Sequence, residues 1–105
     1  EGNPRLVAHL QRERNQALVK KKKKQVLDST GKLSCEVCGF DFQSFFGAIG
    51  EGFCEVHHLK PLSKTDGEVN TTLEDLAIVC SNCHRILHRQ YPMLTLSQLN
   101  KTIRN

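Results

Sequence analysis

Apolar residues in the first third of the chain recur at the spacing of a helix. Over residues 3–31, Pro4 suits a first helical turn and Gly31 suits a stop. The apolar positions between them fall near a period of about 3.6 residues and are Leu6, Val7, Leu10, Ala17 and Leu18, continued by Val26 and Leu27. We therefore expect one helix over this segment.

Two shorter apolar runs have the length of β-strands. Residues 52–59 begin at Gly52 and end before Pro61. Residues 73–80 carry three side chains suited to burial, namely Leu76, Ile78 and Val79. Asp66 and Gly67, between the two runs, are typical of a turn. The pattern predicts two strands joined by a loop.

The last quarter of the chain returns to helical spacing. Residues 81–90 and 95–105 predict two helices, and Thr95 and Gln98 are placed as a capping box for the second. The buried face of that last helix is expected to consist of Leu96, Leu99 and Ile103. The whole pattern thus predicts two short strands among three helices.

Composition narrows the class of protein. The chain has 105 residues, 38% of them hydrophobic and none of them Trp. We therefore expect a small core that is stabilised by some additional cross-link. The sequence shows neither a signal peptide nor an apolar run of about 18 residues that would span a membrane. We therefore expect a cytoplasmic protein, in a reducing environment where paired cysteines indicate a metal site. The start without Met suggests a piece of a longer protein with an upstream domain.

Positive charge is concentrated in the N-terminal segment. The formal net charge is +4, and an unbroken basic run comprises Lys20, Lys21, Lys22, Lys23 and Lys24. Such a cluster attracts polyanions through counterion release, which predicts contact with DNA if another part of the chain acts on phosphate. The alternative is a solvated helix face.

Four of the five cysteines form two C-x-x-C pairs, Cys35 with Cys38 and Cys80 with Cys83. Two such turns can complete a tetrahedral sulfur shell, which suits a structural Zn²⁺. A redox dithiol has the same spacing as one pair, so a thiol redox domain is an alternative that the second pair disfavours. Cys54 is expected to be a small buried strand residue. The phenylalanines behind the first pair are expected to form a small core and are Phe40, Phe42, Phe45 and Phe46.

Four histidines follow the N-terminal helix, and their spacing suggests a second metal site. His57 and His58 are neighbours in a predicted strand, where adjacent side chains point to opposite faces, so the two rings suit two different tasks. His84 and His88 lie one helical turn apart and can offer two imidazoles to one ion. In this interpretation one residue of the adjacent pair joins them as a ligand and its neighbour acts as a base. In the other, His84 hydrogen-bonds a zinc thiolate and His88 caps the helix or faces solvent.

The stretches "CEVCGFDF", "GEGFCEVHHLKPLS" and "TLEDLAIVCSNCHRILH" together resemble the HNH endonucleases of the ββα-metal group, in the form with four zinc cysteines. The resemblance includes the spacing of every metal-type residue. It implies an α+β fold, with a ββα-metal nuclease domain and a C-terminal helix over residues 33–105 after a basic helix or arm over residues 1–32. The flanking segments resemble prokaryotic restriction-type members.

By this resemblance, His57 ligates the catalytic ion and His58 is the general base that activates water. His84 is a further ligand, and His88 is a third ligand or a phosphate contact. Asp75 stands where the family has an Asn that pins the loop between the strands. Because an ionised Asp accepts hydrogen bonds but cannot donate them, it either does similar orienting work or holds the ring N–H of the base.

The implied function is metal-dependent hydrolysis of DNA phosphodiester bonds, by nicking or double-strand cleavage, leaving 5′-phosphate and 3′-hydroxyl ends. The divalent ion is expected to be Mg²⁺, Mn²⁺, Ni²⁺ or Zn²⁺. Arg85 and Arg89 flank the helical histidines and are candidate phosphate contacts, with ordinary surface arginines as the alternative. The alternative function is a non-catalytic zinc-knuckle module that binds DNA. The sequence predicts neither a target site nor an oligomeric state.

Overall fold

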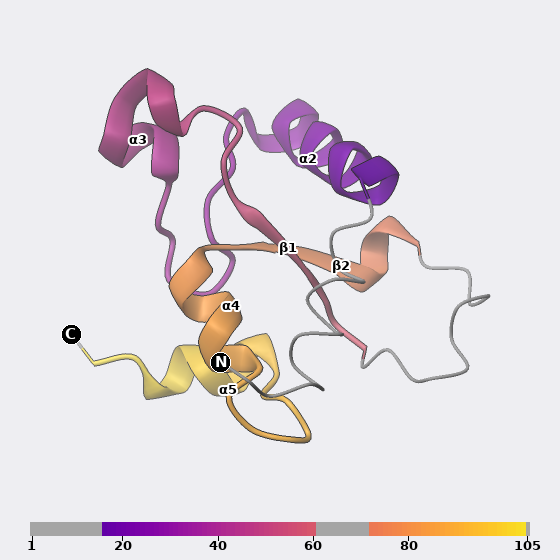
Figure 1. The fold of residues 1–105 in the computed structure, drawn as a ribbon, viewed down its shortest axis with the longest axis vertical. Coiled ribbons are helices and arrows are strands. Elements are labelled where there is room, and N and C mark those ends of the chain that lie inside the picture. The colour runs from indigo at the N-terminus through magenta and orange to yellow at the C-terminus, as the bar shows by residue number, and fades with distance from the viewer. Residues whose placement is uncertain (1–15, 61–71, 105) are drawn as a thin grey trace.

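A computed structural model describes residues 16–60 and 72–104 of the chain (Figure 1). The elements in chain order are α2 (Gln16–Thr30), α3 (Phe42–Phe46), the 3-10 turn η1 (Gly47–Gly50), β1 (Glu55–His58), the 3-10 turn η3 (Leu73–Asp75), β2 (Leu76–Val79), α4 (Ser81–Leu87) and α5 (Leu96–Thr102). The predicted α+β fold is confirmed. The first half of the predicted N-terminal helix and the predicted turn at Asp66 and Gly67 lie outside the described residues. None of the helices in the described part is long and apolar enough to cross a membrane.

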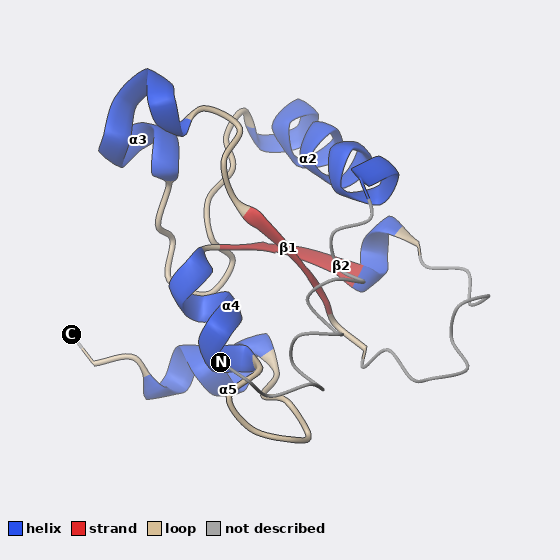
Figure 2. Ribbon diagram, in the orientation of Figure 1, coloured by secondary structure: helices blue, strands red, loops and turns tan. Residues whose placement is uncertain are grey.

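β1 and β2 form an antiparallel pair that lies between α2 and α4 (Figure 2). The register places His57 opposite Ala77 and His58 opposite Leu76. Because successive side chains of a strand point to opposite faces, β1 presents Glu55 and His57 to α4, and it presents Val56 and His58 to α2. The sheet therefore separates the two histidines that are adjacent in sequence.

Two hydrophobic clusters fill the space on either side of the sheet. The cluster facing α2 consists of Leu33, Cys54, Val56, Leu76 and Ile78, covered by Leu18, Val19, Val26 and Leu73. The cluster facing α4 consists of Cys35, Val37, Val79, Cys80, Cys83, Leu87 and Leu99. Three of the four cysteines in the C-x-x-C pairs are thus part of this second core. Cys54 belongs to the first and is buried as predicted, but the prediction that it is a strand residue is wrong, because β1 begins at the next residue.

Both strands are shorter than predicted, because polar and glycine residues at their starts form turns. Gly52 has a φ of +75°, in the left-handed region that glycine adopts without strain, and β1 begins three residues later. Before β2, the Thr72 N–H donates to Asp75 Oδ2 at 3.1 Å and closes a capping box over η3. The prediction of a strand is therefore wrong for residues 73–75.

α5 begins as predicted and ends early. Thr95 and Gln98 form the expected capping box, with Gln98 N–H donating to Thr95 Oγ1 at 3.0 Å. Leu99 is buried, but the helix ends at Thr102 and Ile103 is 38% exposed. The prediction that Ile103 belongs to the buried face is wrong, because the residue follows the helix in extended conformation.

The phenylalanines divide into two groups. Phe40 and Phe42 pack against the cluster facing α4, and their ring centroids are 4.9 Å apart. Phe45 and Phe46 contact these rings from outside and stay 70% and 55% exposed. The predicted small core thus holds for the first two residues and is wrong for the last two, since five-residue α3 presents them to solvent.

The lysine run is not a uniform surface. Lys22 is buried, and its Nζ donates to the Leu73 carbonyl at 3.0 Å, which ties α2 to η3. Lys23 Nζ donates to the Gly52 carbonyl at 2.8 Å. The three lysines that remain exposed are Lys20, Lys21 and Lys24. Lys22 therefore fits neither the predicted DNA-contact patch nor the alternative of a solvated helix face, because helical periodicity turns this residue toward the sheet.

Candidate functional site

Two turns bring together the sulfur atoms of the paired cysteines. The Sγ atoms of Cys35, Cys38, Cys80 and Cys83 all lie within 4.8 Å of one another. Backbone N–H groups of the first turn point at one of these sulfurs, with Val37 N and Cys38 N 3.4 and 3.5 Å from Cys35 Sγ. Four convergent thiols on two knuckles are the donor set of a closed structural zinc site, so this cluster fits Zn²⁺.

The surroundings of these thiols lower the pKa of Cys35 and raise the pKa of Cys83. Burial alone would raise the pKa of Cys35, but the N–H groups of Cys38, Cys80 and Val37 point at its sulfur and lower the pKa overall. Burial raises the pKa of Cys83. The hydrogen bonds at Cys35 favour the thiolate, which is the form that a metal ion binds.

The first knuckle is fixed to the sheet and to the last helix by the two residues between its cysteines, Glu36 and Val37. The backbone N–H of Glu36 donates to the Ile78 carbonyl at 2.8 Å, and Glu36 Oε2 accepts from the Ile78 N–H at 2.7 Å. Asn100 Nδ2 on α5 also donates to the Val37 carbonyl at 2.8 Å. The sulfur cluster therefore joins the knuckle, the sheet and the last helix.

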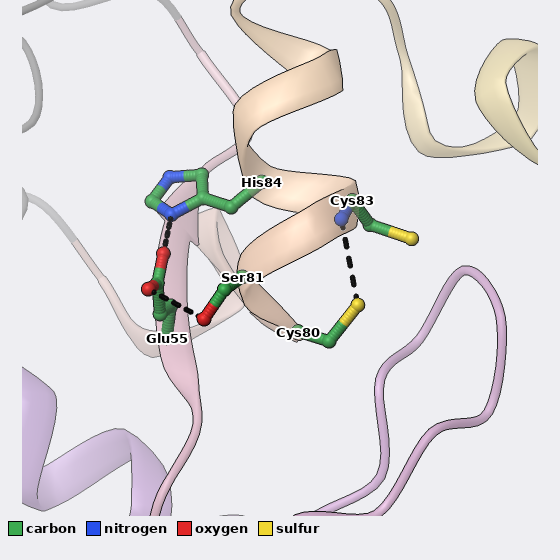
Figure 3. A network of polar contacts seen from close by, with 5 residues as sticks. All are labelled: Glu55, Cys80, Ser81, Cys83 and His84. Atoms are coloured by element: carbon green, nitrogen blue, oxygen red, sulfur yellow. Dashed lines mark hydrogen bonds and ion pairs between the residues drawn. The ribbon is translucent and has the colours of Figure 1, made fainter.

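The second knuckle continues directly into α4. Cys80 is the N-cap residue of this helix, and its Sγ accepts from Cys83 N–H at 3.4 Å (Figure 3). His84 follows the last sulfur ligand and is buried. The position of the His84 ring is thus set by the same turn that supplies two thiols to the zinc cluster.

Three imidazoles converge between α4 and β1. His57, His84 and His88 each offer a ring nitrogen, and these atoms lie within 4.8 Å of one another. The centroid of the His57 ring is 5.2 Å from that of His84 and 5.0 Å from that of His88, and the two α4 rings are also 5.0 Å apart. Three neutral imidazoles at this spacing fit a divalent transition ion with positions left for water and substrate. Of the two sequence-based interpretations, this geometry favours the shared metal site.

His58 lies across the sheet from this cluster and is also buried. The neighbouring backbone is held by the Leu59 N–H, which donates to the Asp75 carbonyl at 2.8 Å. Lys60 Nζ lies 3.9 Å from Asp75 Oδ1. Hydrogen bonds from Thr72 to Asp75 hold the pKa of the Asp75 carboxyl below its usual range, with a smaller contribution from the charge of Lys60. Asp75 therefore pins the turn that enters β2, and its predicted contact with the base ring stays a prediction.

Glu55 is a site residue that the sequence analysis missed. Its Oε1 lies 2.6 Å from His84 Nδ1, and its Oε2 accepts a hydrogen bond from Ser81 Oγ at 3.0 Å (Figure 3). A signal was present in the sequence, because Glu55 lies two residues before His57 and so shares its face of β1. Its partners on α4 could not be read from the sequence, since their meeting depends on how the helix packs on the sheet.

The basic residues proposed for DNA contact lie in two separate regions. Arg85 on α4 and Arg89, two residues after the end of this helix, are both exposed, and each follows a histidine of the cluster by one residue. The exposed lysines are on α2, which packs on the opposite face of the sheet (Figure 1). Lys24 also forms an ion pair with Asp28 at 3.2 Å. The two arginines are therefore nearer in sequence to the histidines of the cluster than the lysines of α2 are.

Comparison with known proteins agrees with this geometry. The model of the HNH endonuclease family matches residues 35–90, which contain both metal-type clusters. The type IV methyl-directed restriction enzyme EcoKMcrA of Escherichia coli (strain K12) is 43% identical over 54 residues, which is 51% of this chain and 18% of the length of that enzyme. The comparison with solved structures gives no match. The family match spans more than half of the chain, and the chain belongs to the HNH endonuclease family.

Proposed function

We propose that this chain is a metal-dependent DNA endonuclease that hydrolyses phosphodiester bonds. The convergence of His57, His84 and His88 carries this proposal, because three ring nitrogens within 4.8 Å can hold one divalent ion. A four-sulfur site closes all positions of its ion and does no chemistry. A three-imidazole site leaves positions open, which is the arrangement that hydrolysis requires.

The bound divalent ion would supply positive charge against the charge that develops on the phosphate and on the leaving 3′ oxygen. His58 is the proposed general base, and a nitrogen of its ring takes the proton from the attacking water. The ring contacts support this division of labour, since His57 lies 5.2 Å from His84 and 5.0 Å from His88 between ring centroids, whereas the three-histidine group found among the described residues does not include His58. Asp75 is the proposed positioning residue, through its hold on the turn before β2.

Arg85 and Arg89 are proposed to contact the phosphates that flank the scissile bond. Both are exposed and follow a proposed ligand histidine by one residue, Arg85 within α4 and Arg89 just after its end. Lys20, Lys21 and Lys24 are proposed to contact the DNA backbone further away, because α2 lies across the sheet. Contacts of this kind position the duplex and carry no sequence information.

The choice of target is a separate question from the chemistry. The restriction enzyme of E. coli is methyl-directed by name, and the matched segment is 18% of its length. The match therefore supports nuclease activity for this chain.

Nicking of supercoiled plasmid tests the proposal directly. The protein is incubated with Mg²⁺, Mn²⁺, Ni²⁺ or Zn²⁺ in turn, and open-circular and linear products are separated on a gel. We expect nicking with at least one ion, none after chelation, and ends that DNA ligase reseals because they carry 5′-phosphate and 3′-hydroxyl groups. Binding of the plasmid without nicking under any of the four ions would instead identify a non-catalytic DNA-binding module.

A further inference from the structure

The carboxylate of Glu55 has two hydrogen-bond partners that lie on α4. His84 Nδ1 is 2.6 Å from Oε1, and Ser81 Oγ is 3.0 Å from Oε2 (Figure 3). The side chain of His84 is 4% exposed and that of Glu55 is 35% exposed. A short contact between a carboxylate and a nearly buried ring is strong and well directed, because little water competes for either group.

This contact determines which nitrogen of His84 is available to a metal ion. An ionised carboxylate accepts hydrogen bonds and cannot donate them, so the proton of the neutral ring lies on Nδ1. The lone pair of Nε2 is then the one that His84 offers to the imidazole cluster. Without an acceptor at Nδ1, the ring would divide its population between two tautomers and two orientations.

Ser81 fixes the carboxylate in turn. It is the first residue of α4 and follows the zinc-type ligand Cys80, which is the N-cap of the helix. Its Oγ donates a hydrogen bond to Oε2, the second carboxylate oxygen of Glu55. The carboxylate therefore cannot rotate away from His84 without losing this bond. Glu55 is therefore held at a defined angle by the same helix turn that belongs to the sulfur cluster.

We infer that Glu55 is a positioning residue that sets the metal affinity of the imidazole cluster through His84, with Ser81 as its support. The inference rests on the proposed function, in which His84 is a metal ligand. Carboxylates that orient ligand histidines commonly change metal affinity by about 10- to 100-fold when they are removed. Glu55 is thus expected to act on the binding of the ion without touching it.

The test measures metal binding and the ring tautomer, not catalysis. The 105-residue chain with zinc in the sulfur cluster is titrated with Ni²⁺ by calorimetry, for the wild type, Glu55→Gln, Glu55→Ala and Ser81→Ala. We expect Kd to rise about 10- to 100-fold in both Glu55 variants, and by a smaller factor in Ser81→Ala, which keeps the bond to His84. In Glu55→Gln the side-chain amide can donate to Nδ1, which moves the ring proton to Nε2 and closes that nitrogen to the ion.

Glu36→Gln is the matched control. Glu36 also accepts a short hydrogen bond, 2.7 Å from the Ile78 N–H, but its partner is a backbone group of β2. We expect this variant to keep the Ni²⁺ affinity of the wild type within about twofold. Imidazole ¹⁵N spectra without Ni²⁺ provide the second readout, with the Nδ1–H form of His84 expected in the wild type and a mixed or Nε2–H form in Glu55→Gln.

The outcomes separate this inference from the proposed function. A wild type that binds no Ni²⁺ at the imidazole cluster would overturn the inference, whereas the proposed function is overturned only if plasmid nicking also fails with Mg²⁺, Mn²⁺, Ni²⁺ and Zn²⁺. A wild type that binds Ni²⁺, together with unchanged Kd and an unchanged tautomer in Glu55→Gln, would overturn the inference alone. An equal loss of affinity in Glu36→Gln would also overturn it, because the effect would then follow from general stability.

Discussion

His57 and His58 are consecutive residues of β1, and the sheet places their rings on opposite faces. His57 lies 5.2 Å from His84 between ring centroids, on the side of α4, whereas His58 lies opposite Leu76 in the register. Leu76 belongs to the cluster that faces α2. One strand thus supplies a proposed metal ligand to one face and a proposed base to the other, as the alternation of strand side chains requires.

His57→Ala is expected to empty the imidazole cluster and leave the sulfur cluster filled. The variant removes one of three nitrogens that lie within 4.8 Å of one another and none of the four sulfurs. After loading with Ni²⁺ and dialysis, elemental analysis should find one zinc and one nickel ion per wild-type chain, and zinc alone in the variant. A variant that keeps its nickel would show that this ion is bound elsewhere.

Cys80→Ser is expected to unfold most of the domain. Cys80 is both a zinc-type ligand and the N-cap of α4, and Ser is a good N-cap residue, so the substitution isolates the loss of zinc from the loss of the cap. Structural zinc contributes on the order of 10–16 kcal/mol in zinc-finger peptides, which exceeds the stability of most small domains. Far-ultraviolet circular dichroism and thermal melts measure the effect. A zinc-free variant with the wild-type Tm would contradict the assignment of a structural zinc.

Lys22→Met is expected to lower stability and Lys21→Met to leave it nearly unchanged, although the residues are adjacent. Lys22 Nζ donates to the Leu73 carbonyl at 3.0 Å, and Met keeps the apolar stem but not this bond, so the free energy of unfolding should fall by about 1–2 kcal/mol. Lys21 is exposed, so its substitution should change stability by less than about 0.5 kcal/mol.

DNA binding is expected to change more in Lys21→Met than in Lys22→Met, the reverse of the order expected for stability. Loss of a phosphate contact at Lys21 should weaken binding and reduce the slope of log K against log salt concentration by about 1. Lys22→Met should keep the wild-type slope, because its side chain faces Leu73 and not solvent. Denaturant unfolding and binding titrations at several salt concentrations measure the two effects. An unchanged slope in Lys21→Met would remove this lysine from the DNA-contact hypothesis.

Thiol reactivity should distinguish Cys54 from the other four cysteines. Burial raises the pKa of the Cys54 thiol to about 11, so little thiolate exists at neutral pH. Zinc-loaded, folded protein should therefore show no fast reaction with a thiol reagent such as 5,5′-dithiobis(2-nitrobenzoate) at pH 7. Chelation in denaturant should release five reactive thiols, and four in Cys54→Ala. A single fast thiol in the zinc-loaded protein would mean that Cys54 is open to solvent or that one sulfur is not a ligand.

Local sequence patterns predicted the parts of this fold that depend on near neighbours. The C-x-x-C turns, the capping box at Thr95 and Gln98, and the one-turn spacing of His84 and His88 all concern residues within four positions of one another. The sulfur and imidazole clusters were predicted because metal ligands are rare residue types with restricted spacing. Their mutual placement then follows from α4, which begins in one cluster and continues into the other.

Features that depend on packing between distant elements could not be predicted in the same way. The buried position of Lys22 depends on the carbonyl of Leu73, and the role of Glu55 depends on the approach of His84 from α4. Charge suggested solvent exposure for Lys22, and tertiary packing overrode it. The exposure of Phe45 likewise reflects how short α3 is, which hydrophobicity alone does not reveal.

Plasmid nicking by His58→Ala, compared with the wild type at equal metal content, tests the central claim most directly. His58 is proposed to move a proton and not to hold the ion, so the variant should keep its fold, its zinc and its Ni²⁺ affinity. We predict that its single-turnover nicking rate falls by about 10²- to 10⁴-fold, the usual contribution of a general base. A variant that nicks plasmid at the wild-type rate with the same metal content would contradict the account.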